Sequence, residues 1–148
     1  HALNSLRMEK AYRHWSHDIT DEDTPVEAGL EFAVRLGKEG GFIGRDALLK
    51  QKEVGVSRRL VQFRLADPEP LLYHNEPIWR GDELVGHITS GAYGHSLGAC
   101  IGLGYVAVDP GAEEIPDGSF EVEVAGVRVP AEASLRPFYD PGNQRIRC

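Results

Sequence analysis

The chain has 148 residues, about the length of one domain, of which 41% are hydrophobic and 26% charged; this composition is sufficient for a buried core and argues against disorder. Its formal net charge of −7 argues against a nucleic acid as partner, because phosphate binding needs a basic surface. No apolar run approaches the roughly 20 residues of a membrane-spanning helix, and the cysteines, Cys100 and Cys148, are too few for a disulfide scaffold.

The first part of the chain carries the pattern of helices and loops. Apolar side chains recur near the helical period across Leu3–Tyr12, which predicts a helix with Asn4 or Ser5 as its N-cap. Residues 44–52 predict a second, short amphipathic helix with an acidic first turn and a basic last turn. We therefore expect a lead-in of helices and loops up to residue 54.

After Gly55 the period of apolar residues changes to two, which is typical of strands. The expected elements are a strand at 61–65, a hairpin at 77–89 turning at Arg80-Gly81-Asp82, a strand at 101–108, and a hairpin at 120–129 turning at Ala125-Gly126. Short strands separated by turn residues predict a small barrel or sandwich. The expected fold class is α+β, with a lead-in at 1–54 and a compact antiparallel β domain at 55–148.

The stretch Gly94-His95-Ser96-Leu97-Gly98 matches the G-x-S-x-G pattern of a nucleophilic serine. That chemistry needs a strand before the serine, a helix after it, and a histidine base later in the chain. No histidine follows Ser96, and the residues after Gly98 predict a strand. The pattern therefore predicts a glycine-rich turn between strands rather than a hydrolase site.

Two imidazoles and a carboxylate lie close together at His14, His17 and Asp18. A metal site needs three or four converging ligands, and no second cluster in the sequence supplies the others. We therefore expect these residues to be polar groups at the surface or polar groups that support a neighbouring site from behind, and no metal site is expected in the chain.

Glu9 lies on the amphipathic face of the first predicted helix, beside Leu6 and Met8. A glutamate in this position is most often exposed and paired with a neighbouring cation. The functional alternative is a carboxylate that accepts two N–H bonds from the edge of a planar, amidine-like ring. The basic residues near the C-terminus, Arg136, Arg145 and Arg147, are expected to lie in a solvated, frayed tail.

Several short stretches distributed along nearly the whole chain carry a family resemblance. They are Leu6-Arg7-Met8-Glu9-Lys10-Ala11-Tyr12-Arg13-His14-Trp15, Thr24-Pro25-Val26-Glu27-Ala28-Gly29-Leu30, Phe42-Ile43-Gly44-Arg45-Asp46-Ala47-Leu48, Thr89-Ser90-Gly91 and Gly102-Leu103-Gly104-Tyr105-Val106. Each is unspecific alone, but their order and spacing resemble the later part of the glycine cleavage T-protein family. The resemblance implies that 1–54 is the end of the middle lobe of a folate-binding module plus a connector helix. It implies that 55–148 is the C-terminal β-barrel.

Two segments favour one branch of this family. Glu9–Trp15 and Pro137–Arg147 resemble the sarcosine and dimethylglycine dehydrogenases, the sarcosine enzymes more closely. Such enzymes oxidise an N-methyl amine with a flavin and pass the one-carbon unit to tetrahydrofolate. The alternatives are an aminomethyltransferase of the glycine cleavage system and a non-catalytic, T-protein-like interaction module.

The resemblance also implies the binding residues. Glu9 matches the family glutamate that holds the amino and N–H edge of the pterin ring, a charge-assisted contact that positions the ring. A family arginine falls on Lys38 in an ungapped match, and lysine cannot reproduce the planar two-donor fork of arginine. Arg45 or a C-terminal arginine such as Arg145 could take its place.

The resemblance places the catalytic aspartate and the flavin (FAD) in parts of the family that precede His1. We therefore expect this chain to be a piece of a longer protein, without a catalytic residue of its own and inactive alone. Its expected partners are tetrahydrofolate and the N-terminal lobes, and apolar surface left uncovered favours self-association. The expected location is the bacterial cytoplasm or the mitochondrial matrix.

Overall fold

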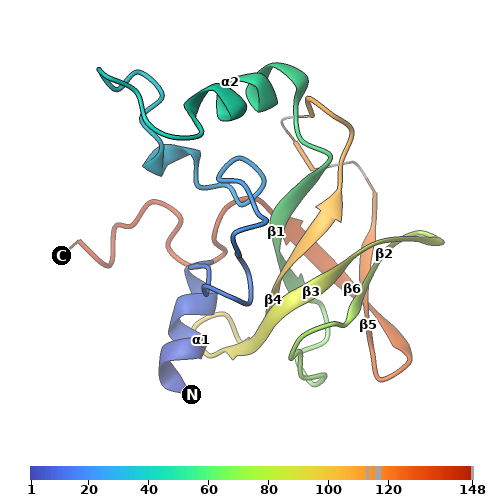
Figure 1. Ribbon diagram of the computed structural model, residues 1–148. Coiled ribbons are helices and arrows are strands. Elements are labelled where there is room, and N and C mark those ends of the chain that lie inside the picture. The colour runs from blue at the N-terminus through green and yellow to red at the C-terminus, as the bar shows by residue number, and fades with distance from the viewer. Residues whose placement is uncertain (113, 116–117, 148) are drawn as a thin grey trace.

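The computed structural model describes residues 1–112, 114–115 and 118–147 as a lead-in of helices and loops beside a β-barrel (Figure 1). The lead-in contains α1 (Ala2–Glu9), the 3-10 helix η1 (Glu31–Ala33) and α2 (Arg45–Val54). The strands are β1 (Arg58–Leu65), β2 (Pro77–Arg80), β3 (Glu83–Gly94), β4 (Ala99–Ala107), β5 (Phe120–Val124) and β6 (Val127–Ser134). The α+β prediction is confirmed.

The strands of the described residues form a closed antiparallel barrel in the order β1-β4-β3-β2-β5-β6. The barrel closes where β6 pairs with β1, from Gln62 opposite Ser134 to Leu65 opposite Ala131. Closure leaves no unpaired strand edge, so the second domain is a barrel and not a sandwich.

Both predicted hairpins are present. Arg80 pairs with Glu83 around Gly81, whose φ is +60°, and the β5–β6 turn places Ala125 and Gly126 at φ +51° and +79°. Positive φ at both central residues is the geometry that matches the twist of a two-residue hairpin. Strand β3 is longer than expected and continues to Gly94. Its pairing with β4 extends to Gly94 opposite Ala99, with a register shift between Ile88 and Ser90.

The core of the barrel is built from inward-facing aliphatic side chains around Phe63. Phe63 is fully buried, and its ring meets the ring of Phe120 edge-on at 5.7 Å between centroids. Two adjacent strands approach closely at Gly86, where a Cβ would lie 1.8 Å from the carbonyl oxygen of Tyr105. Only glycine permits that approach of β3 to β4.

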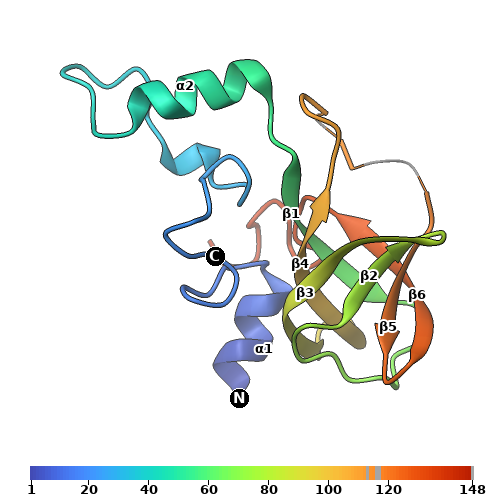
Figure 2. The ribbon, with the colours of Figure 1, turned by 45° about the vertical axis from the view of Figure 1, so that its right-hand side comes forward.

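Helix α1 forms in the predicted region but ends at Glu9 and does not reach Tyr12, and its N-cap prediction is wrong. The helix begins at Ala2 with His1 in the N-cap position and no side-chain cap. Ser5 lies inside the helix, where its hydroxyl donates to the carbonyl oxygen of Tyr93 at 2.6 Å. Tertiary contact with the end of β3 therefore outweighs local capping. Helix α1 lies beside the barrel, and α2 lies at the opposite end of the lead-in (Figure 2).

The C-terminal tail returns to the end of α1 instead of fraying. The backbone N–H of Phe138 donates to the side-chain oxygen of Gln62 at 2.8 Å. The ammonium of Lys10, itself buried, donates to the carbonyl oxygen of Asp140 at 2.6 Å and to the side-chain oxygen of Asn143 at 2.7 Å. A buried ammonium needs such partners, so the expectation of a frayed tail is wrong for residues 138–143. No helix among the described residues is long and apolar enough to cross a membrane.

An ion-pair cluster joins the lead-in to the first strand. The guanidinium of Arg58 contacts Asp23 at 2.9 Å and Glu27 at 3.2 Å, and lies 4.8 Å from the centroid of the Tyr105 ring. Partial burial raises the pKa of Glu27, but hydrogen bonds from Thr24 and Arg58 more than offset this and leave the pKa below its ordinary 4.5. The ionised form of Glu27 therefore stabilises the folded chain.

We expect Phe63→Ala to lower the free energy of unfolding by about 3–5 kcal/mol, because it removes a buried ring and leaves a cavity. The measurement is urea unfolding followed by circular dichroism. Phe32→Ala is the matched control, because Phe32 is 85% exposed, and it should change stability by less than about 0.5 kcal/mol. Equal midpoints for both variants would contradict the core assignment.

We expect Glu27→Gln to destabilise the chain at pH 7 and to have no effect at low pH. The folded-state pKa of Glu27 is lowered, so its contribution is complete above the unfolded value and is lost as the pH falls through the folded value. Unfolding curves of both proteins between pH 7 and pH 3 would test this. A difference that stays constant with pH would argue against the ion pair.

Candidate functional site

Two adjoining cavities flank α1. The first, which we call the apolar cavity, has a volume of about 670 Å³ and is lined by His1, Ala2, Asn4, Ser5, Leu6, Glu9, Leu71, Leu72, Tyr73, Gly91, Ala92, Tyr93, His95 and Ser96. The second, the polar cavity, has a volume of about 260 Å³ and is lined by Asn4, Arg7, His14, His17, Tyr73, His74, Thr89, Ser90 and Gly91. Asn4, Tyr73 and Gly91 line both, so the two cavities adjoin.

Glu9 is the last residue of α1 and only 2% of it is exposed. One carboxylate oxygen accepts from the backbone N–H of Ser96 at 2.6 Å, and the other accepts from the Ser96 hydroxyl at 2.8 Å. The C-terminal end of a helix disfavours a negative charge, and these two donors offset that effect. A carboxylate offers about four acceptor positions, so each oxygen of Glu9 can accept one further hydrogen bond.

Ser96 lies in the turn between β3 and β4, as the glycine-rich pattern predicts. The backbone N–H groups of Leu97 and Gly98 both donate to the carbonyl oxygen of Gly94, and Gly98 has a φ of +66°. The turn brings the N–H and the hydroxyl of Ser96 to one carboxylate. Ser96 therefore orients Glu9. The sequence alone did not predict this role, because 87 positions separate the two residues.

Apolar side chains make up most of the remaining wall of the apolar cavity. Leu6 from α1 and Leu71 from the β1–β2 connection line it and are both exposed, while Leu72 is buried. Tyr93 contributes a ring from the end of β3. A fixed carboxylate on a largely apolar wall suits a planar ring with two adjacent N–H groups on one edge.

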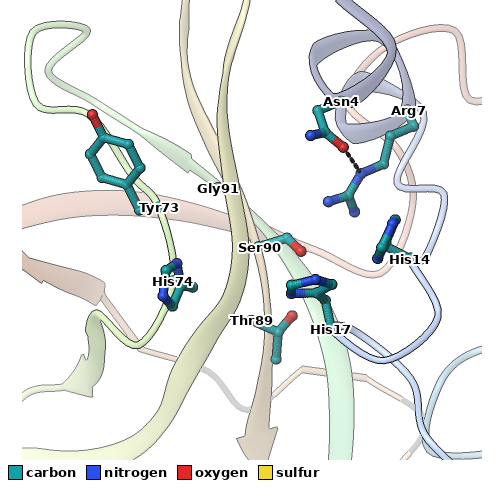
Figure 3. A pocket seen from close by; sticks show the side chains of 9 residues that line it. All are labelled: Asn4, Arg7, His14, His17, Tyr73, His74, Thr89, Ser90 and Gly91. Carbon is teal, nitrogen blue, oxygen red and sulfur yellow. Dashed lines mark hydrogen bonds between the residues drawn. The ribbon is translucent and has the colours of Figure 1, made fainter. Parts of the chain in front are cut away.

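Asp18 is buried behind the polar cavity, only 1% exposed, and contacts three of the residues that line it. Its carboxylate accepts from Arg7 at 2.6 Å, from the backbone N–H of His14 at 2.8 Å and from the Thr89 hydroxyl at 2.5 Å. Three donors satisfy the buried charge. Arg7 of α1 and Thr89 of β3 thereby hold the loop that carries His14 and His17. Figure 3 shows Arg7, His14, His17 and Thr89 around the polar cavity.

The other residues expected to bind the ligand lie elsewhere. Lys38 is exposed in the loop after η1. Arg45 begins α2 and donates to the carbonyl oxygen of Leu36 at 2.7 Å. Arg145 lies in the tail, its guanidinium 5.8 Å from the centroid of the Tyr139 ring. Neither cavity is lined by any of these three, so the structure places only Glu9 of the expected set at a cavity beside α1.

The described residues contain no group of three or more His, Cys, Asp or Glu side chains that could hold a metal ion. His14 and His17 stand together, with ring centroids 4.7 Å apart. Both line the polar cavity.

Comparison with known protein families shows which family the chain belongs to. Residues 58–140 match the glycine cleavage T-protein C-terminal barrel domain, and residues 1–38 match the GCVT N-terminal domain. The chain belongs to the glycine cleavage T-protein family. The matched ranges carry the barrel and α1 respectively, and with them Ser96 and Glu9.

Individual relatives agree with this assignment. The chain is 46% identical over 147 residues to 4-methylaminobutanoate oxidase (formaldehyde-forming) of Paenarthrobacter nicotinovorans, covering 99% of this chain and 17% of the oxidase. It is 37% identical over 150 residues to human mitochondrial sarcosine dehydrogenase, covering 99% of this chain and 16% of the dehydrogenase. The crystal structure of the glycine cleavage system aminomethyltransferase T from Bartonella henselae superposes with a TM-score of 0.78 at 28% identity, covering 93% of this chain and 38% of that one. The chain thus spans about a sixth of the oxidase and dehydrogenase relatives.

We expect Ser96→Ala to lower the free energy of unfolding by about 1.5–3 kcal/mol, because a buried carboxylate loses one of its two donors. Urea unfolding at pH 7 would measure the change. Ser57→Ala is the control, because Ser57 is exposed and its hydroxyl makes no hydrogen bond within the described residues. Indistinguishable midpoints for the two variants would mean that the Ser96 hydroxyl does not support Glu9.

Proposed function

We propose that this chain holds the pterin ring of tetrahydrofolate in a one-carbon enzyme that oxidises an N-methyl amine. The observation that carries the proposal is the carboxylate of Glu9. It is buried, it is oriented by Ser96, and it lies on the wall of a cavity with apolar sides. The apolar cavity, at about 670 Å³, falls within the size range of small-molecule sites.

The chemistry of the cavity fits the pterin edge. The 2-amino group and the neighbouring ring N–H are adjacent donors, and the two oxygens of Glu9 each have one acceptor position left. A paired, charge-assisted contact of this kind fixes the rotation of the ring in its plane. The apolar side chains Leu6 and Leu72 would meet the faces of the ring and exclude water.

In this proposal the residues of the chain bind and orient, and none reacts. The catalytic aspartate of the family and the flavin (FAD) would belong to lobes outside this sequence. Two of the relatives are named for N-methyl amines, 4-methylaminobutanoate and sarcosine. We infer the same class of substrate here, an N-methyl amine whose methyl carbon leaves as a one-carbon unit.

The proposed protein would be modular. Residues 1–54 would complete a folate-binding lobe, and residues 55–148 would form the barrel that closes the cavity. Leu3 and Leu6 on α1 are 80% and 61% exposed, which suits a surface covered by N-terminal lobes or by a second copy of the chain. We propose a bacterial cytoplasmic or mitochondrial matrix location, in line with the mitochondrial dehydrogenase relative.

A second candidate is an aminomethyltransferase of the glycine cleavage system, which the likeness to the Bartonella structure favours. The two candidates share the pterin site. They differ in the donor of the one-carbon unit, an N-methyl amine or an aminomethyl group. Flavin-dependent oxidation of N-methyl amines by the full-length protein would select the first.

We expect tetrahydrofolate to bind saturably and Glu9→Gln to weaken binding by roughly 10- to 150-fold, the effect of losing a hydrogen bond to a charged group. The measurement is isothermal titration under reducing conditions, with the 148-residue chain and with the full-length protein. Glu53→Gln, at an exposed position on α2, is the matched control. Thermal unfolding would verify that each variant is folded.

Unchanged affinity in Glu9→Gln would contradict the placement of the pterin on Glu9. If neither the chain nor the full-length protein binds tetrahydrofolate, the proposed function is wrong. The chain would then serve as a packing or assembly module.

A further inference from the structure

The C-terminal tail, residues 135–147 after β6, passes the end of α1 (Figure 1). Among the residues that the structure describes, none of this tail lines the apolar cavity or the polar cavity. The tail nevertheless contacts the turn of α1 that carries Glu9. A change in the tail can therefore affect the ligand site through α1, without contact between the tail and the ligand.

The tail bonds to Glu9 and to the residue that follows it. The carbonyl oxygen of Glu9 accepts from the backbone N–H of Tyr139 at 3.4 Å. The ammonium of Lys10 donates to the carbonyl oxygen of Asp140 at 2.6 Å and to the side-chain oxygen of Asn143 at 2.7 Å, and lies 3.5 Å from the carboxylate of Asp140. An ammonium has three donors, so all three are directed at the tail. Because Lys10 is only 7% exposed, these contacts fix its position.

The acceptors of Lys10 lie in a turn that is closed on Asp140. The backbone N–H of Asn143 donates to the carbonyl oxygen of Asp140 at 2.9 Å, and the backbone N–H of Gln144 donates to its carboxylate at 2.7 Å. Asp140 and Asn143 have φ values of +46° and +55°, a conformation that aspartate and asparagine adopt more readily than most residues. The turn therefore holds both acceptors in one arrangement.

The end of α1 has a backbone conformation that needs support from outside the helix. Ala11 has a φ of +52°, its N–H donates to the carbonyl oxygen of Met8, and the N–H of Tyr12 donates to that of Arg7. This is a Schellman motif, in which the left-handed position is usually a glycine. The Cβ of an alanine disfavours that conformation, so contacts from the surrounding structure must maintain it.

The carboxylate of Glu9 depends on the position of this helix end. Its two oxygens lie 2.6 Å and 2.8 Å from the donors of Ser96, and its Cγ packs beside Gly94, where an added Cβ would lie 3.5 Å away. A binding group must be held within about 0.5 Å of its productive geometry. A small displacement of α1 would therefore cost Glu9 its orientation.

We propose that residues 138–143 of the tail are a strap that holds the carboxylate of Glu9 against Ser96 and thereby sets the affinity of the site for its ligand. Lys10 and Asn143 are positioning residues in this arrangement. The effect on affinity rests on the proposed function, whereas the coupling of the tail to Glu9 rests on the contacts alone.

The test replaces Asn143 with glycine, which removes an acceptor of Lys10 and still adopts a positive φ. Asn143→Asp is the conservative variant, because it keeps a side-chain oxygen at the same place. Gln144→Gly is the matched control, because Gln144 is exposed and its side chain makes no hydrogen bond within the described residues. Thermal unfolding verifies that each variant is folded.

Hydrogen exchange followed by nuclear magnetic resonance reports the position of Glu9 without any ligand. The amide of Ser96 donates to Glu9, whereas the amide of Gly98 in the same turn donates to the carbonyl oxygen of Gly94. We expect Asn143→Gly to speed exchange at Ser96 by roughly 3- to 10-fold, within the range of coupling in one hydrogen-bond network, and to leave Gly98 unchanged. Asn143→Asp should retain the wild-type rate. Unchanged exchange at Ser96 in Asn143→Gly would overturn the proposal.

Isothermal titration of tetrahydrofolate measures the consequence for the ligand, with the chain and with the full-length protein. We expect Asn143→Gly to weaken binding by roughly 3- to 10-fold, while Asn143→Asp retains the wild-type affinity and Gln144→Gly has no effect. In the Glu9→Gln background, Asn143→Gly should cause little further loss, because the tail acts through the carboxylate. An equal fold-loss in both backgrounds would show that the tail supports the fold at large and would overturn the positioning role.

The two measurements separate this inference from the proposed function. If wild-type protein does not bind tetrahydrofolate but Asn143→Gly speeds exchange at Ser96, the proposed function is wrong and the coupling of the tail to Glu9 is supported. If tetrahydrofolate binds and Asn143→Gly changes neither exchange nor affinity, the strap is overturned and the proposed function stands.

Discussion

The structure depends on the burial of the C-terminal end of α1 against the barrel. A helix end leaves backbone carbonyl groups without partners, and here they meet side chains and the tail. Gln62 donates to the carbonyl oxygen of Met8 at 2.6 Å and accepts from the backbone N–H of Phe138 at 2.8 Å. The carbonyl oxygen of Glu9 accepts from the backbone N–H of Tyr139 at 3.4 Å. One buried glutamine thus joins the helix, the first strand and the C-terminal tail.

The same packing orients the groups proposed to bind the ligand. The end of α1 is bonded to the barrel and the tail, and there Glu9 accepts from the two donors of Ser96 in the β3–β4 turn. On the other side of the helix, Asp18 joins Arg7 to Thr89 of β3. Two buried carboxylates therefore fix α1 to the barrel from both sides. Their donors come from segments that are distant in sequence, so folding of the barrel and formation of the site are coupled.

The parts of the fold that local chemistry determines could be predicted from the sequence. The Ala125-Gly126 turn and the period-two strands beside it form as expected, because turn geometry and alternation act over a few residues. The errors have tertiary causes. Ser5 did not cap α1, because its hydroxyl reaches Tyr93, and the tail did not fray, because the buried ammonium of Lys10 requires acceptors. Each error concerns a polar group whose partner lies far along the chain.

The sequence by itself determined the α+β class, the hairpins, the family and the choice of Glu9 as the residue of interest. It did so because side-chain periodicity, turn residues and ordered motifs are local properties of the chain. Only the tertiary structure decided that Glu9 is buried on the wall of an apolar cavity, with Ser96 as its partner, and that Lys38, Arg45 and Arg145 lie elsewhere. Barrel closure sets these distances, because it brings together residues that no local pattern connects.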